Sequence, residues 1–132
     1  MEDDDIKKLS FTARRHAKEP CNMGPLETFN GHAKITGPCG NTMEFWIWVD
    51  RDRVRKVSFL TDGCASSLAG GSMTTCLAEG KTTAQAKALM QKDVLDALDG
   101  LPEDHEHCAL LATNTLAAAC DNYLENTKTG GK

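Results

Sequence analysis

Apolar and polar residues alternate along three segments in the first half of the chain, which predicts three strands. The clearest runs from Thr42 to Asp50, where one face carries Met43, Phe45, Ile47 and Val49. The others are His32 to Thr36 and Val54 to Leu60. A parallel pair needs a crossover of about a dozen residues or more, and the connections here are short. We therefore expect an antiparallel meander.

From about Ser66 onward the spacing of apolar residues becomes helical. Helices are predicted over residues 67–79, 82–91 and 92–98. The N-terminal residues 6–19 have the spacing of a short amphipathic helix, with apolar residues at Ile6, Leu9, Ala13 and Ala17. The longest predicted helix, Glu106 to Glu125, has one apolar stripe formed by Ala109, Ala112, Leu116, Ala119, Cys120 and Tyr123.

Strands followed by helices are typical of an α+β domain. We expect a single domain over residues 1–132, with a three-stranded antiparallel sheet, helices packed on one face and a long C-terminal helix. Residues 1–5 and 126–132 are predicted to be disordered. The pair Gly70-Gly71 inside a predicted helix indicates close packing against the sheet. Trp46 and Trp48 share a strand face and are expected to pack beneath a helix or the N-terminal segment, in preference to forming a docking patch.

The charge balance excludes some classes of function. The chain has 15 Lys and Arg against 19 Asp and Glu, a net charge of −4, which argues against nonspecific nucleic-acid binding. No apolar run approaches the ~20 residues of a membrane span. The first residues, Met1 to Asp5, are acidic where a secretory signal is basic and then apolar. We therefore expect a cytoplasmic protein that binds neither nucleic acid nor membrane.

Six cysteines, at positions 21, 39, 64, 76, 108 and 120, are the main chemical signal. Disulfides are rare in a reducing cytoplasm, so these thiols are expected to be metal ligands, reactive groups or small core residues. Cys39, Cys64 and Cys108 fall at strand or helix ends, which an α+β domain can bring to one edge. Cys76 and Cys120 fit apolar helix faces and are predicted to be structural. Cys21, in a predicted loop, is uninformative.

Together with His107 beside Cys108, the three end-of-element thiols give a Cys₃His set. That set fits zinc or an iron–sulfur cluster, and the residues alone leave a metal site and unrelated surface thiols equally open. A closed structural zinc module is one alternative. Another is an enzyme with Cys64 or Cys108 as a nucleophile activated by His107, but it leaves the remaining thiols unexplained.

Three cysteine motifs resemble those of the NifU/IscU-type iron–sulfur cluster assembly scaffolds. They are Gly37-Pro38-Cys39-Gly40, Thr61-Asp62-Gly63-Cys64-Ala65, and Leu101-Pro102 leading to His107-Cys108-Ala109-Leu110-Leu111. The segments Gly71-Ser72-Met73 and Glu79-Gly80-Lys81-Thr82 also look like the family, and the resemblance covers residues 20–124.

The resemblance implies a scaffold, not an enzyme. A cysteine desulfurase would pass sulfur to a scaffold thiol, iron would join it, and a cluster of the [2Fe–2S] kind would pass to an acceptor protein. Cys39, Cys64 and Cys108 would be the cluster ligands. A ferredoxin as electron donor, zinc in the purified protein, and a monomer or homodimer are all compatible with it.

Two positions depart from the family pattern. Asn41 stands where such scaffolds usually carry Asp, and because an amide is a poor metal ligand we expect His107 to supply the fourth ligand. The stretch Leu101-Pro102-Glu103-Asp104-His105 replaces the Leu-Pro-Pro-Val-Lys that a dedicated Hsp70-type chaperone recognises in some members, so the resemblance does not support that partner. His105 is interpreted as a solvated loop residue.

Overall fold

The computed structural model of the chain describes residues 7–38 and 40–129. Three strands form one antiparallel sheet in the order β1–β2–β3, namely β1 (Gly31–Thr36), β2 (Thr42–Asp50) and β3 (Arg53–Thr61). The predicted strands are confirmed to within one residue at each end, and the predicted α+β class is confirmed.

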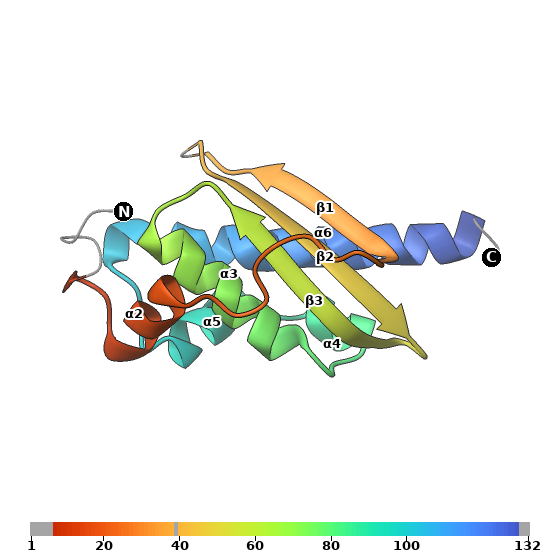
Figure 1. Cartoon of the computed structure of the whole chain (residues 1–132), viewed down its shortest axis with the longest axis horizontal. Coiled ribbons are helices and arrows are strands. Elements are labelled where there is room, and N and C mark those ends of the chain that lie inside the picture. The colour runs from red at the N-terminus through yellow and green to blue at the C-terminus, as the bar shows by residue number, and fades with distance from the viewer. Residues whose placement is uncertain (1–6, 39, 130–132) are drawn as a thin grey trace.

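Helices cover one face of this sheet. They are α2 (Phe11–Lys18), α3 (Ala65–Ala78), α4 (Thr83–Lys87), α5 (Gln91–Ala97), the short 3₁₀ turn η1 (Glu103–His105) and α6 (His107–Thr129). Figure 1 shows α6 running the length of the molecule behind the strands, where it packs on β1 and β2 while α3 packs on β3. Helix α2 packs on α3. Within the described part of the chain, no helix is both long and apolar enough to cross a bilayer.

The register of the sheet brings two loops to one end of the molecule. Thr36 pairs with Thr42 across the β1–β2 loop, and Met43 pairs with Thr61 at the end of β3. The Asp62 carboxylate accepts a hydrogen bond from the Thr42 N–H at 2.8 Å. The residues that follow β3 therefore lie beside the β1–β2 loop (Figure 1).

Side-chain caps set the helix boundaries that periodicity misplaced. The Ser10 hydroxyl accepts a hydrogen bond from the Ala13 N–H at 3.0 Å, so α2 begins at Phe11 and not at residue 6. The predicted helix 82–91 is wrong in length, because α4 ends at Lys87. The Asp93 carboxylate accepts from the Met90 N–H at 2.8 Å and starts α5 as a new helix.

The C-terminal helix is longer than predicted. It continues to Thr129, four residues beyond the predicted end at Glu125. Asn126 ties this last turn to the rest of the molecule, because its side-chain amide donates to the Asn30 carbonyl at 3.4 Å and to the Asn122 side chain at 3.5 Å. The predictions for residues 1–5 and 130–132 lie outside the described residues.

Two apolar clusters form the core. The larger fills the space between the sheet and α6, with Phe45, Phe59 and Leu116 fully buried. A Cβ at Gly71 would lie 2.4 Å from two ring carbons of Phe59, which confirms the predicted close packing against the sheet for Gly71. Gly70 faces the start of α6 instead, where a Cβ would lie 3.4 Å from the Cys108 carbonyl oxygen. The second cluster joins α2, α3, α5 and the start of α6, through residues that include Ala13, Ala69, Val94, Leu98 and Ala109.

The face of the sheet opposite α6 is crossed by the segment that links α2 to β1 (Figure 1). The Asn22 carbonyl accepts from the Phe59 N–H at 3.0 Å, and the Gly24 N–H donates to the Phe59 carbonyl at 2.8 Å, which pairs this segment with β3. Trp46 is only 7% exposed, and Trp48 lines a shallow depression together with residues 25–28. Trp48 therefore lies beside the N-terminal segment, as predicted, and the ring of Trp46 lies against that of His32, with 5.5 Å between the ring centroids.

Candidate metal centre

Cys64 occupies the N-cap position of α3, directly after β3. Its backbone is extended, with φ −81° and ψ −173°, and its side chain is half-buried. The first turn of a helix has unpaired N–H groups and the positive end of the helix dipole, both of which favour a thiolate. The structure therefore holds Cys64 where a thiolate is stabilised and reagents can still reach it.

Cys108 and a histidine approach Cys64 from the turn that leads into α6. Cys108 is 1% exposed, and His105 in η1 has a side chain 31% exposed. His105 Nδ1 lies 3.8 Å from Cys64 Sγ, and the ligand atoms of Cys64, His105 and Cys108 all lie within 4.8 Å of one another. Two thiols and an imidazole at this spacing can hold zinc or iron.

His107 lies beside this group. It is the first residue of α6, and its Nε2 is 3.9 Å from Cys108 Sγ. Its ring stacks on that of His105, with the ring centroids 6.3 Å apart. The end of the molecule that carries the thiols therefore offers two imidazoles.

A chain of hydrogen bonds runs through Ser67 to the two thiols. The Asn41 side-chain amide donates to Ser67 Oγ at 3.3 Å, and the Ser67 hydroxyl donates to Cys108 Sγ at 3.3 Å. The Cys108 thiol in turn donates to Cys64. The family usually has a carboxylate at position 41. Asn41 acts here as a hydrogen-bond donor to Ser67 instead.

These contacts lower the pKa of Cys64 from 9.0 to about 4. The hydrogen bond from Cys108 is the largest cause, and burial opposes it. The backbone N–H groups of Ser67 and Ser66 lower the pKa further, although neither forms a regular capping hydrogen bond. Cys64 is therefore the thiolate of the pair at neutral pH, and Cys108 supplies the proton that stabilises it.

Gly63 leaves room for this arrangement. A Cβ at this position would lie 2.4 Å from Ser67 Oγ and 3.0 Å from the Asn41 side-chain nitrogen. Because real Cβ atoms do not approach other atoms so closely, a larger residue would displace the two polar side chains. The glycine before Cys64 thus allows the β3–α3 turn to lie against the β1–β2 loop.

The structure brings together only part of the predicted ligand set. Cys64 and Cys108 are adjacent, and Cys39 lies outside the described residues, although Asn41 two positions later contacts the site. His107 contacts Cys108 but is not one of the three residues whose ligand atoms are mutually close. His105, interpreted from the sequence as a solvated loop residue, is one of them. The one sequence signal that could have found it, a weak one, is its position three residues before Cys108.

Of the two cysteines predicted to be structural, only Cys120 is buried. Cys120 is fully buried, as predicted, and burial raises its pKa to about 12. The prediction that Cys76 packs in the core is wrong, because Cys76 is exposed. It follows Ala69 and Met73 on the face of α3 that meets α2 and lies beside the end of that helix, near His16 and Cys21, without being buried there.

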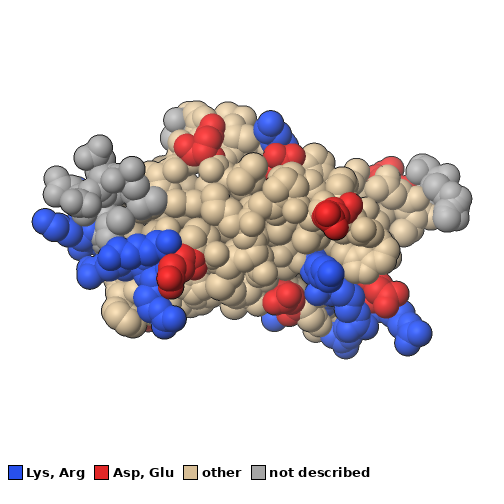
Figure 2. All heavy atoms as spheres, in the orientation of Figure 1, with Lys and Arg blue, Asp and Glu red and all other residues tan. Residues whose placement is uncertain are grey.

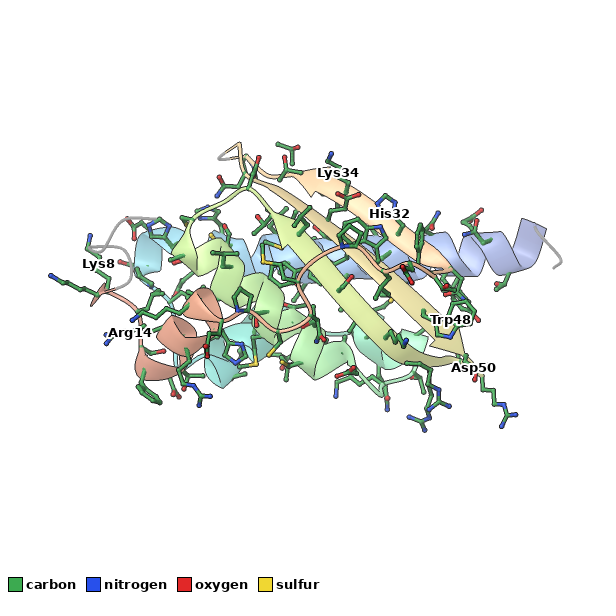
Figure 3. All side chains as sticks on the ribbon, viewed as in Figure 1. Lys8, Arg14, His32, Lys34, Trp48 and Asp50 are labelled. Carbon is green, nitrogen blue, oxygen red and sulfur yellow. The ribbon has the colours of Figure 1, made fainter. Side chains whose placement is uncertain are left out.

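Basic side chains gather at the end of the molecule where α3 and α6 begin. Figure 2 shows Lys and Arg concentrated at two ends of the molecule in this view, with a largely uncharged surface between them. Lys8 and Arg14 project at the end that holds α2 and the start of α3 (Figure 3). Acidic residues lie at this end too, among them Glu103, Asp104 and Glu106 in the turn that leads into α6, so charges of both signs surround the thiols.

Comparison with known proteins agrees with this geometry. The pattern of the NifU-like N terminal domain family matches residues 11–130. The iron-sulfur cluster assembly scaffold protein IscU of Aquifex aeolicus is 39% identical over 112 residues, covering 83% of this chain and 71% of the relative. The IscU 1 protein of Archaeoglobus fulgidus is 37% identical over 110 residues, covering 83% and 72%. A NifU-like N-terminal structure from Brucella abortus superposes with a TM-score of 0.71 at 18% identity, covering 92% of this chain and 96% of the other.

The chain belongs to the NifU-like N-terminal domain family. This confirms the family predicted from the three cysteine motifs. Members of the family are scaffold proteins and not enzymes, so the predicted class is also confirmed, and the nucleophilic-enzyme alternative is set aside.

Proposed function

We propose that this protein is a scaffold on which an iron–sulfur cluster is assembled and from which the cluster passes to acceptor proteins. The observation that carries the proposal is the Cys64–His105–Cys108 group at one end of a NifU-like chain. A scaffold must receive sulfur, hold iron and release the product. Each of these steps makes a separate demand on the residues described above.

Sulfur transfer requires a nucleophilic thiolate that a partner can reach. Cys64 is half-buried with a pKa of about 4, so it fits that role. Its Sγ would attack the outer sulfur of a persulfide on a cysteine desulfurase, forming a new S–S bond while the donor cysteine leaves as a thiolate. Conversion of that sulfur to sulfide needs two electrons, which we assign to a ferredoxin-type donor.

The cluster would be bound by Cys39, Cys64 and Cys108 and one imidazole. A [2Fe–2S] cluster takes four protein ligands, and histidine can replace cysteine among them. The sequence favoured His107 for this position, and the mutual distances of the ligand atoms favour His105. With Asn41 donating to Ser67, no carboxylate at that position is available as a fourth ligand.

Release of the cluster would occur at this same end of the molecule. Cys64 and both histidines are only half-buried, so an acceptor thiol can reach the metal without unfolding the domain. A deeply enclosed cluster would not exchange ligands in this way. The partners this implies are a desulfurase, an electron donor and acceptor proteins that still lack their cluster, in a compartment reducing enough to keep the thiols free.

The test is anaerobic reconstitution with ferrous iron, cysteine and a cysteine desulfurase, followed by visible absorption. We expect a sulfide-to-iron charge-transfer spectrum in the wild type that weakens in Cys39→Ser, Cys64→Ser and Cys108→Ser. The control is Cys120→Ala, which alters a fully buried thiol away from the site. The same series in His105→Ala and His107→Ala identifies the imidazole ligand.

A permanent zinc module is the rival function, because two thiols and an imidazole within 4.8 Å also suit zinc. Tightly retained zinc, no chromophore after reconstitution and unfolding on chelation would support that module and overturn the scaffold. Zinc that ferrous iron and sulfide displace is compatible with the scaffold.

A further inference from the structure

We propose that His16, Cys21 and Cys76 form a second metal site, separate from the candidate metal centre, that takes a thiophilic cation such as Zn²⁺. The three residues come from the last turns of α2, the turn that follows it, and the C-terminal half of α3. Figure 1 shows α2 lying alongside α3, and the two helices pack together. Sequence patterns do not reveal this site, because 54 positions separate Cys21 from Cys76.

The ligand atoms are already close. One imidazole nitrogen of His16 and the sulfurs of Cys21 and Cys76 all lie within 4.8 Å of one another. Ligands around a tetrahedral zinc, with Zn–S of about 2.3 Å and Zn–N of about 2.0 Å, lie roughly 3.5–3.8 Å apart. Small side-chain movements would therefore bring these atoms to bonding distance. Two thiolates and an imidazole are ligands that soft and borderline cations prefer.

Ser72 orients two of the three ligands. Its Oγ lies 2.7 Å from His16 Nδ1 and accepts a hydrogen bond from the Cys21 N–H at 2.8 Å. Ser72 and Cys76 are four residues apart on α3 and so lie on the same helix face. When the His16 proton is on Nδ1, the ring donates to Ser72 and leaves Nε2 as the ligand atom, which is how metal-binding histidines are commonly held.

The surroundings can accommodate a divalent cation. Burial, and then the charge of Arg15, lower the pKa of His16, so the imidazole is neutral as a metal ligand must be. Two thiolates balance the charge of Zn²⁺, and the neutral complex is not repelled by Arg15. A cavity of about 160 Å³, lined in part by His16, Glu19 and Cys21, lies against the site. It leaves space for water or the Glu19 carboxylate as a fourth ligand.

A cation at this position would connect the end of α2 and its following turn to α3. Cys64 is the N-cap residue of α3, so the second site would stabilise the helix pair that supports the candidate metal centre. The bound state would resist heat more than the metal-free state, because a ligand that binds only the folded chain shifts the unfolding equilibrium.

The experiment measures zinc bound by the reduced full-length chain, by competition with a chromophoric chelator. It is run on the wild type, Cys76→Ser, Cys21→Ser and the control Cys120→Ala. The wild type should bind one equivalent more than Cys76→Ser or Cys21→Ser, and Cys120→Ala should equal the wild type. In a chain with Cys39, Cys64 and Cys108 all replaced by Ser, cobalt should give a thiolate-to-cobalt absorption band that disappears when Cys76 is also replaced.

The thermal midpoint gives a second measurement that does not depend on the triple variant folding. Zinc should raise it in His105→Ala, where the candidate metal centre is weakened, and should raise it less once His16→Ala is added. Equal zinc stoichiometry in the wild type and in both single cysteine variants would overturn the proposal. So would a Cys21–Cys76 disulfide in the isolated protein whose reduced form binds no additional zinc.

Discussion

The lowered pKa of Cys64 predicts that this thiol reacts with iodoacetamide at acidic pH. The rate should rise with a single inflection near pH 4 and then stay level through neutrality, because the thiolate is the reactive form. Cys108→Ala removes the hydrogen bond that contributes most and should move the inflection upward the furthest. Ser67→Ala removes a smaller contribution and should move it less, since the backbone N–H groups of the first turn of α3 remain.

The alkylation rate at one pH barely distinguishes a low-pKa thiol from an ordinary one, so the pH of the inflection is the quantity to measure. At pH 6 an ordinary thiol of pKa about 8.5 is roughly 0.3% thiolate, whereas a thiol with a pKa of about 4 is almost wholly ionised. A less basic thiolate is also a weaker nucleophile, with a Brønsted slope of about 0.4–0.5, which removes roughly a hundredfold of that advantage. The remaining excess at pH 6 is about threefold, so only the pH profile separates the two cases.

Site-resolved mass spectrometry of tryptic peptides provides the assay. Residues 57–81 form one tryptic peptide that contains both Cys64 and Cys76, so Cys76→Ser is used as the background to leave one thiol in that peptide. The lowered pKa of Cys64 also sets the direction in which the free energy of unfolding changes with pH. Ionised Cys64 stabilises the fold above its unfolded-state pKa, and this contribution is lost as pH falls from about 9 to about 4. An inflection between pH 8 and 9 in the wild type, or an unchanged profile in Cys108→Ala, would refute the reasoning.

Three further predictions concern packing, alkaline stability and the first loop. Gly71→Ala should lower the free energy of unfolding by about 1–3 kcal/mol in urea titration, because its Cβ would meet the Phe59 ring at 2.4 Å; Gly70→Ala, with 3.4 Å to its nearest neighbour, is the matched control. Burial of Cys120, with a pKa of about 12, should reduce stability as pH rises above about 9, by at most about 1.4 kcal/mol per pH unit, and Cys120→Ala should flatten that slope. Asn41→Asp replaces an amide donor with a negative charge beside the Cys64 thiolate and should raise the pH at which Cys64 alkylation inflects. An unchanged inflection would show that the hydrogen bonds from Asn41 through Ser67 do not lower the pKa of Cys64.

The sequence predicted the strands well because one face of each is buried. In β2, Met43, Phe45, Ile47 and Val49 are all core residues, so the alternation had a direct physical cause. Helix boundaries were predicted less well. They depend on hydrogen bonds of single side chains, such as the Ser10 cap of α2, which leave no trace in apolar periodicity.

The candidate metal centre was predictable as far as its thiols are concerned. Cys64 and Cys108 stand at helix starts, positions that sequence patterns reveal. The role of His105 was missed because a single 3₁₀ turn before α6 aims its ring at Cys64, and such turns have weak sequence signals. The environment of Cys76 was predicted wrongly for a tertiary reason, since its exposure depends on where α2 ends beside α3.

The central claim is that a cluster built on this chain passes intact to another protein. The most direct measurement loads the protein with a cluster labelled in iron and sulfide, adds an apo-ferredoxin, and follows both labels with an iron chelator present. Both labels should reach the ferredoxin together and at the same rate. Cys39→Ser, Cys64→Ser and Cys108→Ser should each reduce the amount transferred, and Cys120→Ala should not. Iron captured by the chelator while the ferredoxin stays without cluster, or labels that remain on the chain, would contradict the central claim.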